Sequence, residues 1–240
     1  MKSNCCCRYF LLLCACACLA FCGFIGCRNP TGGEAETAEK PGLVTLHFSL
    51  SLDPAVYKQT KYKKPPQLAI WLEAAAGAKI RTVWVTEKTG TGNWGGKIVR
   101  PVSLPYWVSR WKKETQSSDS PNPENPAVVA VTGATPVQNL ACEIQVPVNS
   151  TWDYYIEINA SGDYNDAFRP VLKDGRKDPN GNGQPSIIYE GQITALPGQR
   201  SVPRLIGRTD QLEGVSRIIP DLEGVSSAKN MLSKIEVTSR

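Results

Sequence analysis

The stretch Leu43-Val44-Thr45-Leu46-His47-Phe48-Ser49-Leu50-Ser51-Leu52 decides the fold class of this chain. Apolar and polar residues alternate along it with a period of two, which is the pattern of a β-strand with one face on a core and one face in solvent. Every second side chain from Val44 to Leu52 is therefore expected to lie in the core. The polar side chains between them are expected to face away from it.

Similar short apolar segments recur between Pro- and Gly-rich turns. They are residues 67–75, 80–86, 128–131, 141–148, 154–159 and 187–195. The first two, joined by residues 76–78, predict a hairpin. A helix is expected over 103–115, capped by Ser103, and a short helix over 226–234. Many short strands with few helices predict a mainly β fold, an antiparallel Ig-like β-sandwich with one or two short helices.

The N-terminal residues predict a secretory leader. Lys2 and Arg8 precede an uncharged apolar run over 9–25, and Gly26 stands directly before Cys27. This run is shorter than the ~20 residues that a membrane-spanning helix needs, so a signal peptide is favoured over a span. The Gly26-Cys27 pair resembles the cleavage site of bacterial lipoproteins, in which the cysteine becomes the lipidated first residue of the mature chain. An ordinary cleaved signal peptide and an uncleaved anchor are the alternatives.

The leader sets the expected domain organisation. Residues 1–26 are the lipoprotein signal peptide, and residues 27–41 form a flexible tether because they are polar and contain almost nothing to bury. Residues 42–240 form a single β-sandwich domain. We expect the mature protein in the bacterial cell envelope, held by its N-terminal lipid in the outer membrane and facing the periplasm.

Charge and cysteine content exclude several classes of protein. Removing Lys2 and Arg8 with the leader lowers the net charge from +5 to +3, and no long basic run remains, so nucleic acid is not an expected partner. Eight of the nine cysteines lie within residues 1–27. If Cys27 carries lipid, Cys142 has no partner for a disulfide and is expected to be a buried, inert thiol.

Catalysis is not expected. His47 is the only histidine, and it has no carboxylate or cysteine near it in the sequence. Catalytic triads and zinc sites normally combine histidine with such partners. We therefore expect an exposed, inactive histidine and a protein that is not an enzyme.

A calcium site is one hypothesis for a ligand. Residues 178–183, Asp-Pro-Asn-Gly-Asn-Gly, follow the first half of a calcium-binding loop. The twelfth position of that loop calls for Glu and is Tyr189 here, so an irregular site is the form to expect. Its ligands would be Asp174, Asp178, Asn180 and Asn182. A plain turn explains the same residues, since all of them favour tight reversals.

A flavin site is the second hypothesis. Thr132-Gly133-Ala134-Thr135 resembles the attachment motif of the FMN-binding domain family, in which a flavin transferase esterifies the last Thr with the phosphate of FMN. By this resemblance Thr135 would carry the flavin. The acidic residue that precedes the motif in that family is replaced by Val129. A β-turn without a cofactor is the alternative.

Across residues 43–238 the chain resembles a family of periplasmic proteins of unknown function, domain of unknown function 2271. The residues that carry the resemblance are 65–73, 80–85, Trp107, Trp111, 131–136 and 182–189. The resemblance implies an extracytoplasmic Ig-like β domain, often linked to membrane redox or flavin-transfer systems, and it supplies no catalytic residues.

Two functions follow from the sequence. The first is a non-catalytic binding or accessory module at the cell envelope, anchored to the membrane by lipid and serving an envelope protein as partner. The alternative is an envelope electron carrier with FMN on Thr135.

Overall fold

Two β-sheets form the framework of the computed structural model, which describes residues 42–74, 80–95, 103–127, 132–133, 135–212 and 216–240. Sheet A is antiparallel throughout and has the order β5-β1-β10-β8. Its strands are β1 (Leu43–Leu52), β5 (Asn139–Pro147), β8 (Arg200–Ser201) and β10 (Leu232–Ser239).

Sheet B has the order β4-β3-β2-β6-β7-β9 and is antiparallel except for the parallel pair of β3 and β4. Its strands are β2 (Gln67–Ala74), β3 (Ile80–Thr86), β4 (Thr132–Gly133), β6 (Thr151–Asn159), β7 (Ile187–Thr194) and β9 (Arg204–Arg208). The helical segments are α1 (Pro54–Tyr57), α2 (Glu87–Thr91), α3 (Pro105–Thr115) and the 3₁₀ turn η2 (Ser227–Asn230).

The core lies between the two sheets. Side chains at alternate positions of β1, from Val44 to Leu52, are buried against the inner side chains of β2, β6 and β7. Phe48 of sheet A meets Tyr154 of sheet B edge to face, with the ring centroids 5.7 Å apart. The mainly β, sandwich-type fold predicted from the sequence is confirmed, and so are the two faces of β1.

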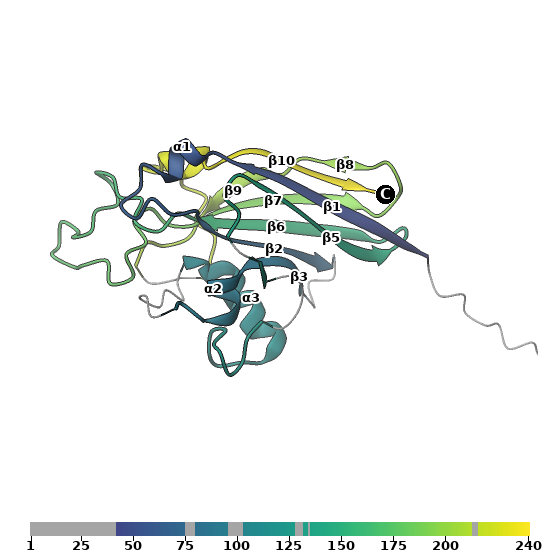
Figure 1. Ribbon diagram of the computed structural model, residues 1–240, viewed down its shortest axis with the longest axis horizontal. Helices are drawn as coiled ribbons and strands as arrows, with labels where there is room; N and C mark the ends of the chain where they lie inside the picture. Colours follow the sequence, from purple (N-terminus) through teal and green to yellow (C-terminus); the bar gives the residue numbers. More distant parts are fainter. Residues whose placement is uncertain (1–41, 75–79, 96–102, 128–131, 134, 213–215) are drawn as a thin grey trace, which may run out of the picture. The chain divides into compact units, whose positions relative to one another are not determined.

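A third layer covers the outer face of sheet B. Ala69 and Trp71 of β2 point away from the sheet A core and pack against Trp107 and Trp111 of α3. Figure 1 shows α2 and α3 on the side of sheet B opposite to sheet A. Because β2 is covered on both sides, its buried residues run almost continuously instead of alternating.

The helix predictions had mixed outcomes. The helix expected over 103–115 is present as α3, although it begins two residues later. The prediction of a helix over 226–234 is wrong, because only the 3₁₀ turn η2 is helical there. After η2 the chain continues into strand β10, which pairs with β1. Pairing of this segment with the edge of β1 outweighs its local preference for a helix.

Several sequence-based predictions lie outside the described residues. These are the signal peptide and tether (1–41), the hairpin turn at 76–78 and the strand at 128–131. Within the residues that are described, no helix has both the length and the apolar character needed to cross a membrane.

Candidate functional site

A groove of about 620 Å³ lies where α3, β3 and β5 come together, and we call it the α3 groove. Most of its wall is apolar. It is lined by Ile80, Arg81 and Thr82 of β3, by Trp111, Glu114 and Thr115 of α3, by Asn125, Pro126 and Ala127, and by Ile144 of β5. The groove therefore depends on how α3 is held against sheet B.

The apolar face of α3 supplies the first attachment. Trp107 and Trp111 are four residues apart and so lie on one side of the helix, where both are buried against sheet B. The indole Nε1 of Trp107 donates a hydrogen bond of 3.2 Å to Oγ1 of Thr82 on β3. This contact fixes the distance between the two walls of the groove.

A buried carboxylate supplies the second attachment. The N-cap residue Leu104 has no side-chain oxygen, and the hydroxyl of Ser103 is buried without a hydrogen-bond partner, so the predicted Ser103 cap is wrong. Glu157 of β6 takes its place. Its Oε1 accepts from the backbone N–H of Tyr106 at 3.2 Å and its Oε2 from that of Trp107 at 2.7 Å. The carboxylate thus satisfies free amides at the positive end of the helix dipole.

Glu157 is fully buried, and this changes its titration. Burial raises its pKa from the ordinary 4.5 to about 7, although hydrogen bonds from Ser186, Trp107 and Tyr106 favour the charged form. The Ser186 hydroxyl donates to Glu157 at 2.6 Å and also contacts the Thr209 hydroxyl at 2.7 Å. The attachment of α3 is therefore linked to a proton that exchanges near neutral pH.

An aromatic and ionic cluster fixes the other side of α3. Trp71 stacks on Tyr155 with the ring centroids 5.3 Å apart, and the Arg110 guanidinium lies 4.9 Å from the centre of the Tyr106 ring. Arg110 also donates to the Tyr106 hydroxyl at 2.7 Å and pairs with Glu73 at 3.3 Å. These groups contact one another, so we interpret the cluster as a support for α3.

His47 has a partner that the sequence did not reveal. Its Nδ1 lies 3.3 Å from Oε2 of Glu143, which faces it across the β1–β5 pair. The pair borders a hollow of about 450 Å³ on the outer face of sheet A. Ser49 lies on the same face but makes no hydrogen bond with His47 in the described part of the chain. Only the strand register could have linked residues so far apart in the sequence.

The flavin hypothesis concerns a segment next to β3. Thr135 is half-buried and follows β4, whose backbone pairs with Val85 and Thr86 of β3. The opposite end of β3, at Ile80 to Thr82, lines the α3 groove. Val129 lies outside the described residues, and flavin attachment stays a prediction.

The calcium candidates Asp178 and Asp174 already make hydrogen bonds or ion pairs with other groups of the chain. The Asp178 carboxylate accepts hydrogen bonds from the Tyr164 hydroxyl and from the backbone N–H groups of Asn180 and Gly183. Asp174 is exposed and pairs with Arg176 at 2.7 Å, which lowers its pKa.

The remaining calcium candidates are Asn180, which is half-buried, and Asn182. Asn182 is buried and donates to the backbone carbonyl of Gln211 at 3.4 Å. Among the described residues, no three His, Cys, Asp or Glu side chains are grouped so as to hold a metal ion. Calcium binding stays a prediction for solution tests.

Cys27 and Cys142, the two cysteines that the predicted cleavage would leave, have different positions. Cys27 lies outside the described residues. Cys142 is a free thiol on β5 that is partly exposed, and burial, helped by the charge of Glu143, raises its pKa to about 12. It is therefore a thiol and not a thiolate at neutral pH.

Comparison with known proteins gives no relative, since no family model, no curated protein and no solved structure matches this chain. The resemblance to domain of unknown function 2271 thus stays a prediction. The function must be inferred from the geometry of the molecule.

Proposed function

We propose that this protein is a non-catalytic, lipid-anchored binding module of the bacterial cell envelope that holds an apolar ligand group in the α3 groove. The observation that supports it is the groove itself, a mostly apolar hollow with a few polar groups among its lining residues. Such hollows are the usual form of small-ligand sites. The expected leader and Cys27 support the envelope location.

The lining residues favour a ligand with an apolar body and a polar end. Trp111 is almost fully buried, while Ile80 and Ile144 are half-buried and leave apolar surface for a ligand to cover. Covering such surface contributes about 25 cal/mol for each Å². Arg81 and Glu114 supply charged groups for a polar end.

The position of Arg81 is set before any ligand arrives. Its Nη2 donates to the backbone carbonyl of Gln145 at 2.9 Å, and its guanidinium lies 5.7 Å from the centre of the Trp152 ring. A side chain held in this way loses little freedom on binding. The groove is therefore preorganised on its β3 side.

Binding of the neutral dye N-phenyl-1-naphthylamine tests the proposal. The variant Ile144→Lys places a charge on the groove wall and should weaken dye binding at least about tenfold, because an ammonium group resists burial beside an apolar ligand. Val137→Lys is the matched control, since Val137 is 63% exposed and does not line the groove. Equal affinity in the two variants would refute a site in the groove.

FMN on Thr135 is the alternative function, supported by the position of its motif beside β3. Co-expression with a flavin transferase should then add the mass of FMN, and Thr135→Ala should abolish the addition. Thr115→Ala, at an exposed position on α3, is the control. An intact mass without the flavin in the wild type removes this alternative.

A further inference from the structure

Strand β5 forms an edge of sheet A, and its backbone groups point in two directions. The bonds from Val148 N–H to Gly42 C=O and from Leu52 N–H to Gln138 C=O show that the even-numbered residues of β5 bond to β1. The odd-numbered residues Asn139, Ala141, Glu143 and Gln145 therefore direct their N–H and C=O groups away from β1. All four residues are exposed.

The chain itself occupies the carbonyl groups at the two ends of this edge. Arg81 donates to the carbonyl of Gln145 at 2.9 Å, and the Tyr57 hydroxyl donates to the carbonyl of Val137 at 2.7 Å. Between them, Asn139, Ala141 and Glu143 have no edge-side backbone partner among the described residues. We call Asn139 to Glu143 the free run of β5, and it is symmetric about Ala141.

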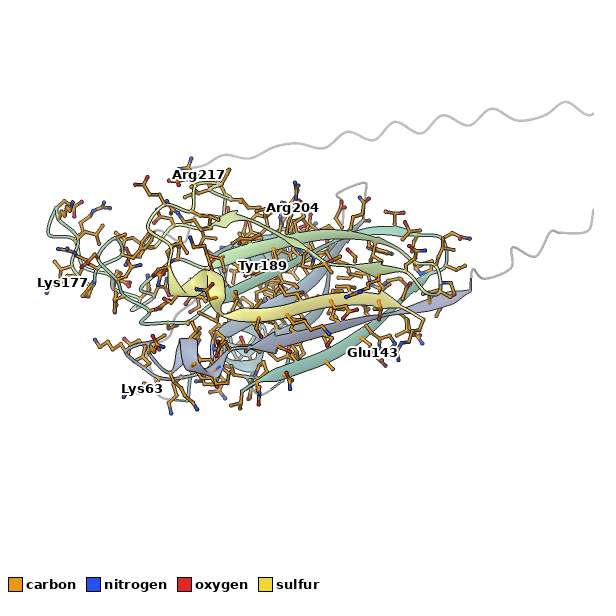
Figure 2. All side chains as sticks on the ribbon, turned by 90° about the horizontal axis from the view of Figure 1, so that it is seen from above. Lys63, Glu143, Lys177, Tyr189, Arg204 and Arg217 are labelled. Carbon is orange, nitrogen blue, oxygen red and sulfur yellow. The ribbon has the colours of Figure 1, made fainter. Side chains whose placement is uncertain are left out.

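Apart from the charged side chain of Glu143, β5 carries none of the usual protections of an edge strand. The strand pairs with β1 over nine residues without a register shift, so no bulge turns the edge away. Proline occurs only at its last residue, Pro147, and it contains no lysine. Exposed edges of this kind are templates for pairing with another strand. Figure 2 shows Glu143 on this outer strand of the molecule.

We propose that β5 pairs antiparallel with β5 of a second copy of the chain, across a two-fold axis at Ala141. Ala141 then faces Ala141 of the second copy, and Asn139 faces Glu143 on both sides. The pairing makes six backbone hydrogen bonds and leaves the carbonyls of Val137 and Gln145 with their present partners. A two-fold interface needs only one self-complementary surface, which this run provides.

The side chains agree with this register. Asn139 accepts from Ser51 through Oδ1, which leaves its amide nitrogen to donate to the Glu143 carboxylate of the second copy. The small Ala141 side chains meet at the axis without crowding. A register centred on Glu143 would instead place two carboxylates opposite each other and would require the carbonyl that Arg81 holds.

The pairing would also complete the hollow on the outer face of sheet A. Ala141 and Glu143 line that hollow on its β5 side, beyond which the described sheet ends. The second copy would supply its own Asn139, Ala141 and Glu143 there and join the two sheets A into one surface. This proposal does not depend on the ligand of the α3 groove.

Native mass spectrometry and amide hydrogen exchange of the membrane-extracted chain test the proposal. The wild type should be a dimer, and Ala141→Pro should weaken it at least tenfold, because the ring removes an amide that makes no bond within its own chain. Gln145→Pro is the matched control. It also lacks only an outward amide, but its position lies outside the six bonds, so the dimer should persist.

Hydrogen exchange adds a readout at single residues. In the dimer the amides of Asn139 and Glu143 should exchange slowly, and in Ala141→Pro they should exchange rapidly. Leu140 and Cys142 should stay slow in both, because their amides bond to β1. A monomeric wild type overturns the proposal. Slow exchange of the Asn139 and Glu143 amides in a monomer would also overturn it. The same holds if these amides exchange slowly only when a different polypeptide is bound.

Discussion

The attachment of α3 through Glu157 leads to a prediction about stability and pH. The variant Glu157→Gln keeps the size of the side chain and one acceptor oxygen but removes the titration. In the wild type, burial raises the pKa of this carboxyl from 4.5 to about 7. The folded state therefore binds the proton more tightly than the unfolded state does, and the contribution to stability is complete below pH 4.5 and is lost as the pH rises through 7.

The size of the effect follows from the same pKa values. Each pH unit of difference between the folded and unfolded pKa corresponds to about 1.4 kcal/mol, so the full change is about 3 kcal/mol. The side chain is fully buried, so solvent screening does not reduce this figure much. The free energy of unfolding of the wild type, minus that of Glu157→Gln, should fall by about 3 kcal/mol between pH 4.5 and pH 8.

Urea unfolding followed by tryptophan fluorescence at a series of pH values measures this difference. Glu124→Gln, at an exposed loop position, is the matched control for replacing one carboxyl group by an amide. A difference for Glu157→Gln that is independent of pH would mean that folding does not shift the pKa of this carboxyl. A difference that grows with pH would mean that the helix N-terminus and the hydrogen bonds outweigh the desolvation of the carboxylate.

Three further predictions concern the loops, the anchor and calcium. Gln184→Ala should lower the free energy of unfolding in urea by about 1–3 kcal/mol, because Gln184 is buried and bonds to Asp163, Ser226 and Ser227. Gln199→Ala, at an exposed position, is the control and should change it little. Cys27→Ser should move the protein from the detergent phase to the aqueous phase and remove the diacylglycerol mass from the N-terminus, and an unchanged partition would contradict the anchor. Calcium binding by the 174–182 loop predicts a melting temperature that rises with calcium, and equal melting in calcium and EDTA would exclude it.

The sequence was informative where the signal is local. Alternation in residues 43–52 predicted both the strand β1 and its buried face, because the side-chain period of a strand depends on the backbone alone. Trp107 and Trp111 likewise indicated α3 through their helical spacing. The segment 226–234 shows the limit of such signals, since its structure depends on pairing with β1.

The functional features were not predictable in the same way. Glu157 alternates with Ile156 and Ile158 and so looks like a solvent-facing residue of a strand. It is buried because α3, from another part of the chain, covers that face of sheet B. The pairing of His47 with Glu143 also depends on strand register, and the α3 groove on three elements at once. These features arise from contacts between distant segments, which no local pattern encodes.

Amide chemical shifts during titration with N-phenyl-1-naphthylamine show whether the α3 groove is the ligand site. If the ligand binds in the groove, the largest shifts should occur at residues lining it, among them Ile80, Trp111 and Ile144. Shifts concentrated instead at the sheet A hollow, around His47 and Thr238, or absent at saturating dye, would contradict it.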